Sequence, residues 1–176
     1  LVEFIKQFDS KIGGNQFKVF GACYPEQHPE SEDVMNDIQG LKAKVDAGAT
    51  HLISQLFFDN EKFYRFLERA KLAGITVPIE AGIMPATNKK SIERMVSLTN
   101  ATLPPKFINM MERYGDSPEA IRDAGIAYAV DQIVDLVTNG VDGIHLYTMN
   151  NSYIAKRINE AVRSLFTVAP KDFVIK

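Results

Sequence analysis

Cysteine is nearly absent from this sequence, in which Cys23 is the one thiol. A single cysteine forms no internal disulfide and supplies too few thiolates for a structural zinc or cluster site. No apolar run approaches the roughly 18 residues of a membrane-spanning helix, and no basic-then-apolar leader opens the chain. These absences predict a cytoplasmic protein without a membrane partner or a metal site.

An excess of charge of one sign is also lacking. The 20 basic and 22 acidic residues give a formal net charge of -2, so a nucleic-acid partner is not expected. With 45% hydrophobic and 24% charged residues, the 176-residue chain has the composition of one globular domain. Residues 1–6 already have helical apolar spacing with no capping residue ahead, which predicts that the chain begins inside a helix.

A helix-exit turn recurs along the chain, at residues 47–50, 73–76 and 139–142. In each, a glycine provides the left-handed conformation that ends a helix, and an apolar run follows. With one earlier run, these segments predict short, mostly apolar strands of the kind found in covered parallel sheets. The predicted strands are Phe17–Tyr24, His51–Phe58, Val77–Met84 and Gly143–Met149.

One-sided helices are expected between the strands, because apolar residues recur there at a spacing near 3.6. Ser117 and Pro118 predict the start of a long helix that continues to Asn139. The predicted helices cover residues 34–45, 63–70, 92–96 and 117–139, with an inserted helix from Pro104, a terminal helix over 153–165 and a tail over 167–176.

Alternating strands and helices predict an α/β fold with a parallel sheet and right-handed crossovers. A Rossmann-type sheet is disfavoured, because the segment after the first strand, residues 24–30, contains no glycine for a phosphate-binding turn. A (β/α)8 TIM barrel needs eight strand-helix units, and the sequence provides four. We therefore expect residues 1–176 to be one domain, half of a barrel and truncated at the N-terminus.

In such a barrel the active site lies at the carboxyl ends of the strands. Polar residues are concentrated at those ends here. The segments concerned are Tyr24–Glu30, Gln55–Asp59, Gly82–Pro85 and Tyr147–Asn150.

Together with Leu41–Ala49, these segments resemble the methylenetetrahydrofolate reductase family in order, spacing and combination. The resemblance covers nearly the whole chain and implies strands five to eight of the barrel. It further implies an FAD-dependent reductase in which NADH or NADPH reduces the flavin, which then converts a methylene-folate to a methyl-folate.

Site residues follow from the same resemblance. The flavin contacts of the family match Ala22, Tyr24, His28, Asp37 and Lys44, and the substrate contacts match Gln55 and Tyr147. No catalytic residue is expected in this chain, because the family's general acid, a glutamate, belongs to an upstream strand. The chain alone is therefore expected to be inactive. Ser91, Asn151 and Met95 replace the family's usual glutamine, arginine and aromatic residue.

Plainer interpretations stay open for several of these residues. Asp37 and Lys44 also fit a solvated helix flank. The plainer interpretation of Gln55 is an amide that is satisfied by neighbouring backbone. Phe57 and Phe58 are expected to pack in the core. Alternative functions are a half-barrel that self-associates through open edges, consistent with a homo-oligomer, and another barrel enzyme acting on a phosphorylated small molecule.

Overall fold

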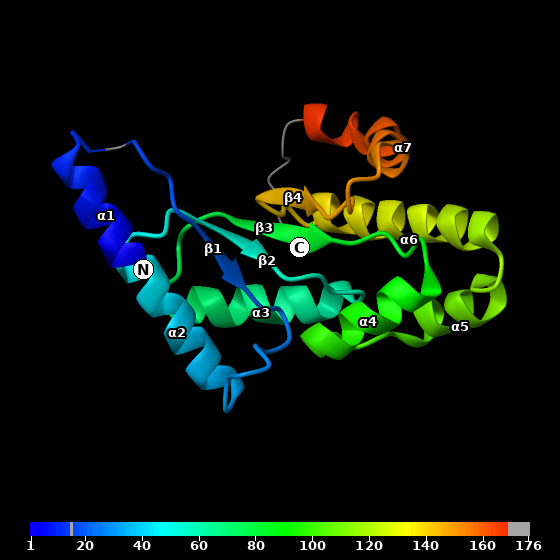
Figure 1. Cartoon of the computed structure of the whole chain (residues 1–176), viewed down its shortest axis with the longest axis horizontal. Helices are drawn as coiled ribbons and strands as arrows, with labels where there is room; N and C mark the ends of the chain where they lie inside the picture. The colour runs from blue at the N-terminus through cyan, green and yellow to red at the C-terminus, as the bar shows by residue number, and fades with distance from the viewer. Residues whose placement is uncertain (15, 169–176) are drawn as a thin grey trace, which may run out of the picture.

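The computed structural model describes residues 1–14 and 16–168 (Figure 1). Helices and strands alternate through most of this range, as predicted. The elements are α1 Val2–Lys11, β1 Phe20–Cys23, α2 Val34–Asp46, β2 His51–Ser54, α3 Asn60–Leu72, β3 Ile79–Ile83, α4 Lys89–Thr99, α5 Pro105–Tyr114, α6 Pro118–Thr138, β4 Gly143–Leu146, α7 Ser152–Val162 and the 3-10 turn Leu165–Thr167. Of the predicted tail, residues 169–176 lie outside the described part of the chain.

The sheet has four parallel strands in the order β1-β2-β3-β4. Each strand is shorter than predicted. The last bond between β1 and β2 is donated by the Gln55 N–H to the Cys23 carbonyl at 2.7 Å, and the chain then leaves the sheet. The polar residues that follow the strands therefore lie in loops at one edge.

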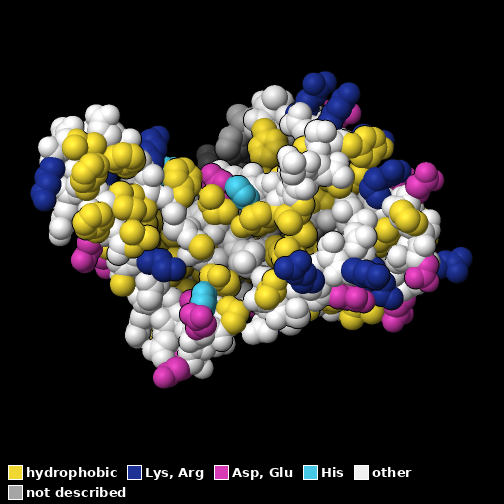
Figure 2. Space-filling model, in the orientation of Figure 1, with side chains coloured by type: hydrophobic (Ala, Val, Ile, Leu, Met, Phe, Trp, Pro, Cys, Tyr) yellow, Lys and Arg dark blue, Asp and Glu magenta, His cyan; other side chains and the backbone are white. Residues whose placement is uncertain are grey.

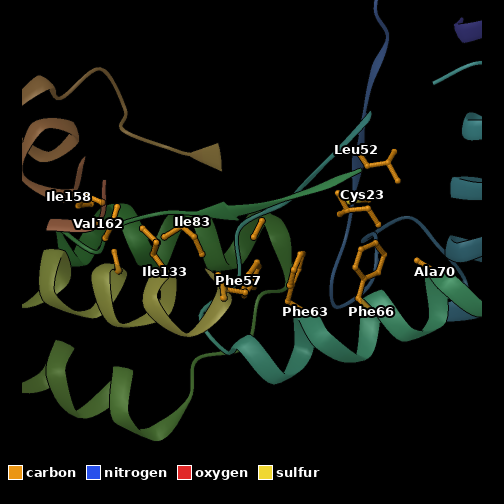
Figure 3. Close-up of a cluster of buried hydrophobic side chains, with 14 of the residues drawn as sticks. Cys23, Leu52, Phe57, Phe63, Phe66, Ala70, Ile83, Ile133, Ile158 and Val162 are labelled. Carbon is orange, nitrogen blue, oxygen red and sulfur yellow. The ribbon is translucent and has the colours of Figure 1, made fainter. Parts of the chain in front are cut away.

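The core lies between the sheet and the helices that pack on one of its faces (Figure 3). Phe63 and Phe66 of α3 point from below toward the sheet, where Leu52 and Cys23 meet them. Ile133 of α6 joins the same cluster, together with buried residues of α7. Because consecutive strands are neighbours, each crossover places its helix on the same face.

No helix of residues 1–14 and 16–168 covers the opposite face of the sheet. Paired residues there are partly or largely exposed, and Phe20 stacks on His51 with ring centroids 4.7 Å apart. On β3 and β4, Glu80 and His145 face each other across 3.9 Å. This arrangement differs from a doubly wound sheet, in which helices cover both faces.

Helix ends follow the predicted chemistry. The side chains of Asp59 and Ser117 accept hydrogen bonds from backbone N–H groups of the first turns of α3 and α6. α1 has no side-chain cap, also as predicted. Gly74 and Gly140, at the exits of α3 and α6, have φ of 75° and 77°, which a residue with a Cβ adopts at a cost.

The inserted helix α5 and its neighbour α4 build a second buried cluster, around Phe58 and Phe107. Their rings lie 4.3 Å apart. α6 approaches the loop after β3 closely: a Cβ on Gly125 would be 1.9 Å from the Ala86 carbonyl oxygen. Only glycine permits this contact, which fixes the loop that begins α4.

An exposed apolar surface covers α1 and the segment after it. In Figure 2, hydrophobic side chains gather over the end of the molecule that carries α1. Phe4 is 69% exposed, and Phe8, Ile12 and Phe17 are each close to half exposed. A surface of this kind is typical of a contact with more protein.

Candidate functional site

The end of β1, the loop after it and helix α2 together form one side of the candidate site. Lys44, two helical turns after Asp37 on α2, extends its ammonium to the Ala22 carbonyl oxygen at 3.2 Å. The Tyr24 and His28 rings meet edge to face, with centroids 4.4 Å apart. Sequence reasoning therefore selected residues that do lie together, and we call Ala22, Tyr24, His28, Asp37 and Lys44 the β1 wall.

Two hydrogen bonds fix His28 in this wall. The His28 N–H donates to Oδ2 of Asp37 at 3.0 Å, and Nδ1 of its ring accepts from the Glu30 N–H at 3.1 Å. Because Nδ1 accepts, the neutral ring carries its proton on Nε2. Asp37 is thus more than a solvated flank residue, while the exposed Lys44 also keeps that character.

Cys23 lies behind the wall on the covered face of the sheet, with 2% of its surface exposed. Burial raises the pKa of its thiol to about 12, although the nearby Lys44 acts in the opposite direction. The side chain is a small buried hydrophobe, as predicted, and no nucleophile at neutral pH.

Gln55 lies at the end of β2, half buried beside Tyr24, and the two residues line a cavity of only about 10 Å³. Its Oε1 accepts from the Leu56 N–H at 2.9 Å. The plainer interpretation therefore holds for the amide oxygen. The amide N–H group makes no hydrogen bond within the described chain and remains a donor.

Tyr147 crosses the open face of the sheet from the end of β4. Its hydroxyl donates to the Ser54 carbonyl at 3.0 Å, and its ring lies over Gly82. Burial raises the pKa of this phenol. The Tyr147 hydroxyl therefore lies next to Gln55. Because its proton is donated to Ser54, Tyr147 offers a ligand the face of its ring rather than a hydrogen-bond donor.

A cavity of about 300 Å³ adjoins Tyr147, between the ends of β3 and β4 and helix α4. Its lining includes Ser91, Met95 and Asn151, the positions at which the sequence departs from the family pattern, and we call it the α4 cavity. Asn151 Oδ1 is engaged as the cap of α7, accepting from the Ile154 N–H at 3.2 Å. Arg94 is the one charged residue among the described residues of this lining, and sequence reasoning missed it.

Phe57 and Phe58 take no part in these surfaces. They are 0% and 1% exposed, and both pack in the core as predicted. Over residues 1–14 and 16–168, no group of three or more His, Cys, Asp or Glu side chains is placed to hold a metal ion. In the same part of the chain, no helix combines the length and the apolar character that crossing a membrane requires.

One loop contact links the two sides of the site. Both carboxylate oxygens of Glu26 accept hydrogen bonds at 2.8 Å from Thr102, one from its N–H and one from its hydroxyl. The loop that carries Tyr24 and His28 is thus tied to the segment that follows α4.

The sequence model of a family described as methylenetetrahydrofolate reductase matches residues 1–163. The 5,10-methylenetetrahydrofolate reductases of Pectobacterium carotovorum and Escherichia coli are 36% and 37% identical over 142 residues, which is 81% of this chain and 48% of those proteins. Methylenetetrahydrofolate reductase (NADH) 1 of Arabidopsis thaliana is 33% identical over 158 residues, 85% of this chain and 26% of the plant protein. The chain spans about half the length of the bacterial relatives it matches.

A solved structure gives a likeness in fold. An uncharacterized protein from Clostridium thermocellum, described as binding two copies of 5-methyl-5,6,7,8-tetrahydrofolic acid, aligns with a TM-score of 0.62 at 17% identity. The alignment covers 94% of this chain and 59% of that protein.

Proposed function

The chain belongs to the methylenetetrahydrofolate reductase family, and from that premise we propose that it takes part in an FAD-dependent reduction. In this proposal the complete protein converts 5,10-methylenetetrahydrofolate to 5-methyltetrahydrofolate with NADH or NADPH. The observation that carries it is the meeting of the β1 wall, Gln55 and Tyr147 at the carboxyl edge of one parallel sheet. A single buried cysteine is in keeping with a cytoplasmic enzyme.

We further propose that the four strands are strands five to eight of a (β/α)8 barrel. Their sequential order and the helices on a single face favour closure over a doubly wound sheet. β1 and β4 both present an edge without a neighbour in the described chain, where further strands of a barrel would pair. The share of the bacterial relatives that the chain covers, 48%, agrees with half a barrel.

The β1 wall fits a flavin dinucleotide. The Lys44 ammonium offers a positive charge for a diphosphate, and the Tyr24 and His28 rings offer flat surface with hydrogen-bonding tips. Asp37 has one carboxylate oxygen on the His28 N–H and a second that is free to accept from a ribose hydroxyl. Bound there, a flavin supplies the hydride chemistry that no side chain of this chain provides.

Gln55 and the α4 cavity form the proposed folate side. The amide N–H group of Gln55 donates to an acceptor on the edge of a pterin ring, and Tyr147 provides ring surface beside it. The α4 cavity, about 300 Å³, accommodates the flat part of a folate or nicotinamide. Its lining includes Ser91 and Met95 where the family has larger polar or aromatic groups, so contacts there differ from the family pattern.

A proton donor is missing from this arrangement. The described lining of the α4 cavity contains neither Asp nor Glu, and general acid catalysis needs a carboxylic acid within hydrogen-bond reach of the reacting nitrogen. The acid in this proposal comes from an upstream part of the complete protein, which makes the 176-residue chain inactive alone.

Turnover tests the proposal. The complete protein, supplied with FAD and a methylene-folate, is expected to oxidise NADH or NADPH and form methyl-folate, whereas the 176-residue chain is expected to give no turnover. A complete protein that binds flavin but leaves the folate unreduced would contradict the proposed reaction. Turnover by the 176-residue chain alone would contradict the proposal that the general acid comes from an upstream part of the protein.

Self-association is a second candidate role. Phe4, Phe8, Ile12 and Phe17 are exposed apolar residues of α1 and the segment after it. They belong to the end of the molecule at which hydrophobic side chains gather in Figure 2. In the proposed barrel, upstream units cover this region, and in the isolated chain a second copy does so. Light scattering after size exclusion tests this role, and a monomer at all concentrations argues against it.

A further inference from the structure

A cavity of about 380 Å³ lies between the loop after β1 and helix α3, away from the α4 cavity. Basic side chains of α3 line one side of it: Lys62, Arg65 and Arg69. Their spacing of three and four residues places them on one stripe of the helix. Each directly precedes one of the buried residues Phe63, Phe66 and Ala70, so the core contacts of α3 hold the basic stripe at the cavity.

No carboxylate of the described chain forms an ion pair with this stripe. None of its ion pairs involves Lys62, Arg65 or Arg69. Glu26 is the one acidic residue of the described lining, and both of its oxygens are occupied by Thr102. The lining therefore carries three positive charges against the single carboxylate of Glu26, and none of the three is held in an ion pair.

The hydrogen bonding of Arg69 also indicates that an anion binds in this cavity. One terminal nitrogen donates to the Pro25 carbonyl at 3.0 Å, which fixes the guanidinium against the loop. Its Nε is buried and has no hydrogen-bond partner. A buried N–H without an acceptor costs free energy. Since Arg69 lines the cavity, an anion that binds this guanidinium would offset that cost.

We propose that this cavity, the α3 cavity, binds a diphosphate group at a place separate from the β1 wall. Two guanidinium groups and one ammonium match the charge of a diphosphate, and the planar guanidinium fork suits phosphate oxygens. The volume of about 380 Å³ exceeds the space that a single phosphate fills. The diphosphate belongs either to a free inorganic anion or to a nucleotide.

The α3 cavity and the β1 wall share one residue. His28 lines the cavity, with Nε2 carrying the ring proton as a donor, whereas the described lining includes neither Ala22 nor Lys44. The inference goes beyond the proposed reduction and does not depend on it.

Calorimetric titration of the chain with inorganic pyrophosphate, at low ionic strength and without phosphate buffer, tests the inference. The double variant Lys62→Gln/Arg65→Gln removes two charges from the stripe at exposed or half-buried positions. Lys71→Gln is the matched control, since it changes an exposed lysine of the same helix that does not line the cavity. Circular dichroism verifies that all variants are folded.

Pyrophosphate is expected to bind the chain and the Lys71→Gln control alike, and about tenfold or more weakly to the double variant. Titration with ADP distinguishes the sources: tighter binding than pyrophosphate indicates a nucleotide, and weaker binding indicates the inorganic anion. No binding by the unmodified chain, or equal weakening in the control, overturns the inference. Displacement of pyrophosphate by FAD, with loss of FAD affinity in the double variant, overturns the separation from the β1 wall.

Discussion

The ring of Tyr147 lies directly over Gly82, so that a Cβ at position 82 would be 2.8 Å from Tyr147 Cε2 and 2.1 Å from the Ser54 carbonyl oxygen. The missing side chain of Gly82 allows the Tyr147 hydroxyl to reach Ser54 across β3. The end of β4 is thereby joined to the end of β2, next to Gln55.

Gly82→Ala is therefore expected to destabilise the fold by roughly 2–3 kcal/mol, since the new methyl group must displace the Ser54 backbone or the Tyr147 ring. Urea unfolding measures this change. Gly40→Ala is the control, because its Cβ on α2 would meet nothing within 4 Å. That substitution should stabilise the protein by about 0.5–1 kcal/mol. Equal stability of the two variants would contradict the close contact.

Tyr147→Phe separates the hydroxyl from the ring. It removes the bond to the Ser54 carbonyl and should cost about 1 kcal/mol of unfolding free energy. If the ring face makes the proposed folate contact, folate affinity of the complete protein should change little in Tyr147→Phe and fall clearly in Tyr147→Ala. Equal losses of affinity in both variants would assign the contact to the hydroxyl.

Lys44→Gln is expected to weaken FAD binding of the complete protein about tenfold, because a charge-assisted bond to a diphosphate is lost. Lys42→Gln is a matched control on the same helix, where the native lysine pairs with Asp46. Flavin fluorescence during titration reports both affinities. If the control loses as much affinity as Lys44→Gln, the effect is general charge rather than a contact in the β1 wall.

Alkaline pH is expected to destabilise the fold through Cys23. Burial raises the pKa of its thiol from 9.0 to about 12, so above pH 9 the unfolded chain loses this proton before the native chain does. Stability should therefore fall as pH rises, by roughly 1 kcal/mol per pH unit from this group. The Cys23→Ala variant should have a flatter profile between pH 9 and 10, below the range in which the phenols of Tyr64, Tyr128 and Tyr147, whose ordinary pKa is 10.0 and is raised in the fold, contribute most.

Thiol modification provides an independent measurement. Cys23 of the native chain should react with a disulfide reagent at pH 8 far more slowly than in urea. Rapid labelling of the native protein would contradict the burial of this side chain.

Local chemistry made much of the fold predictable. Capping by Asp59 and Ser117 and the glycine exits are decided by residues adjacent in sequence, and the structure has them as expected. The second predicted strand extends too far because Leu56 and Phe58 are as apolar as strand residues. Both side chains are buried in the second cluster, against α4 and α5. The spacing of apolar residues in the sequence does not show that they pack there rather than in the sheet.

The site was only partly predictable. Family motifs selected the β1 wall, and the seven-residue spacing of Asp37 and Lys44 placed both on one flank of α2. The α3 cavity had a readable signal, since Lys62, Arg65 and Arg69 share a helical stripe. That stripe differs from an ordinary solvated face only through Pro25 and Glu26, and long-range contacts of this kind are invisible in local sequence.

The double hydrogen bond between Glu26 and Thr102 spans 76 positions of the chain. In the folded chain this contact restrains the short loop between β1 and α2. The restraint is established on folding rather than on ligand binding, so the loop that carries Tyr24 and His28 is preorganised. A ligand that contacts this loop binds more tightly than it would to a disordered loop, because little of the binding free energy is spent on ordering the protein.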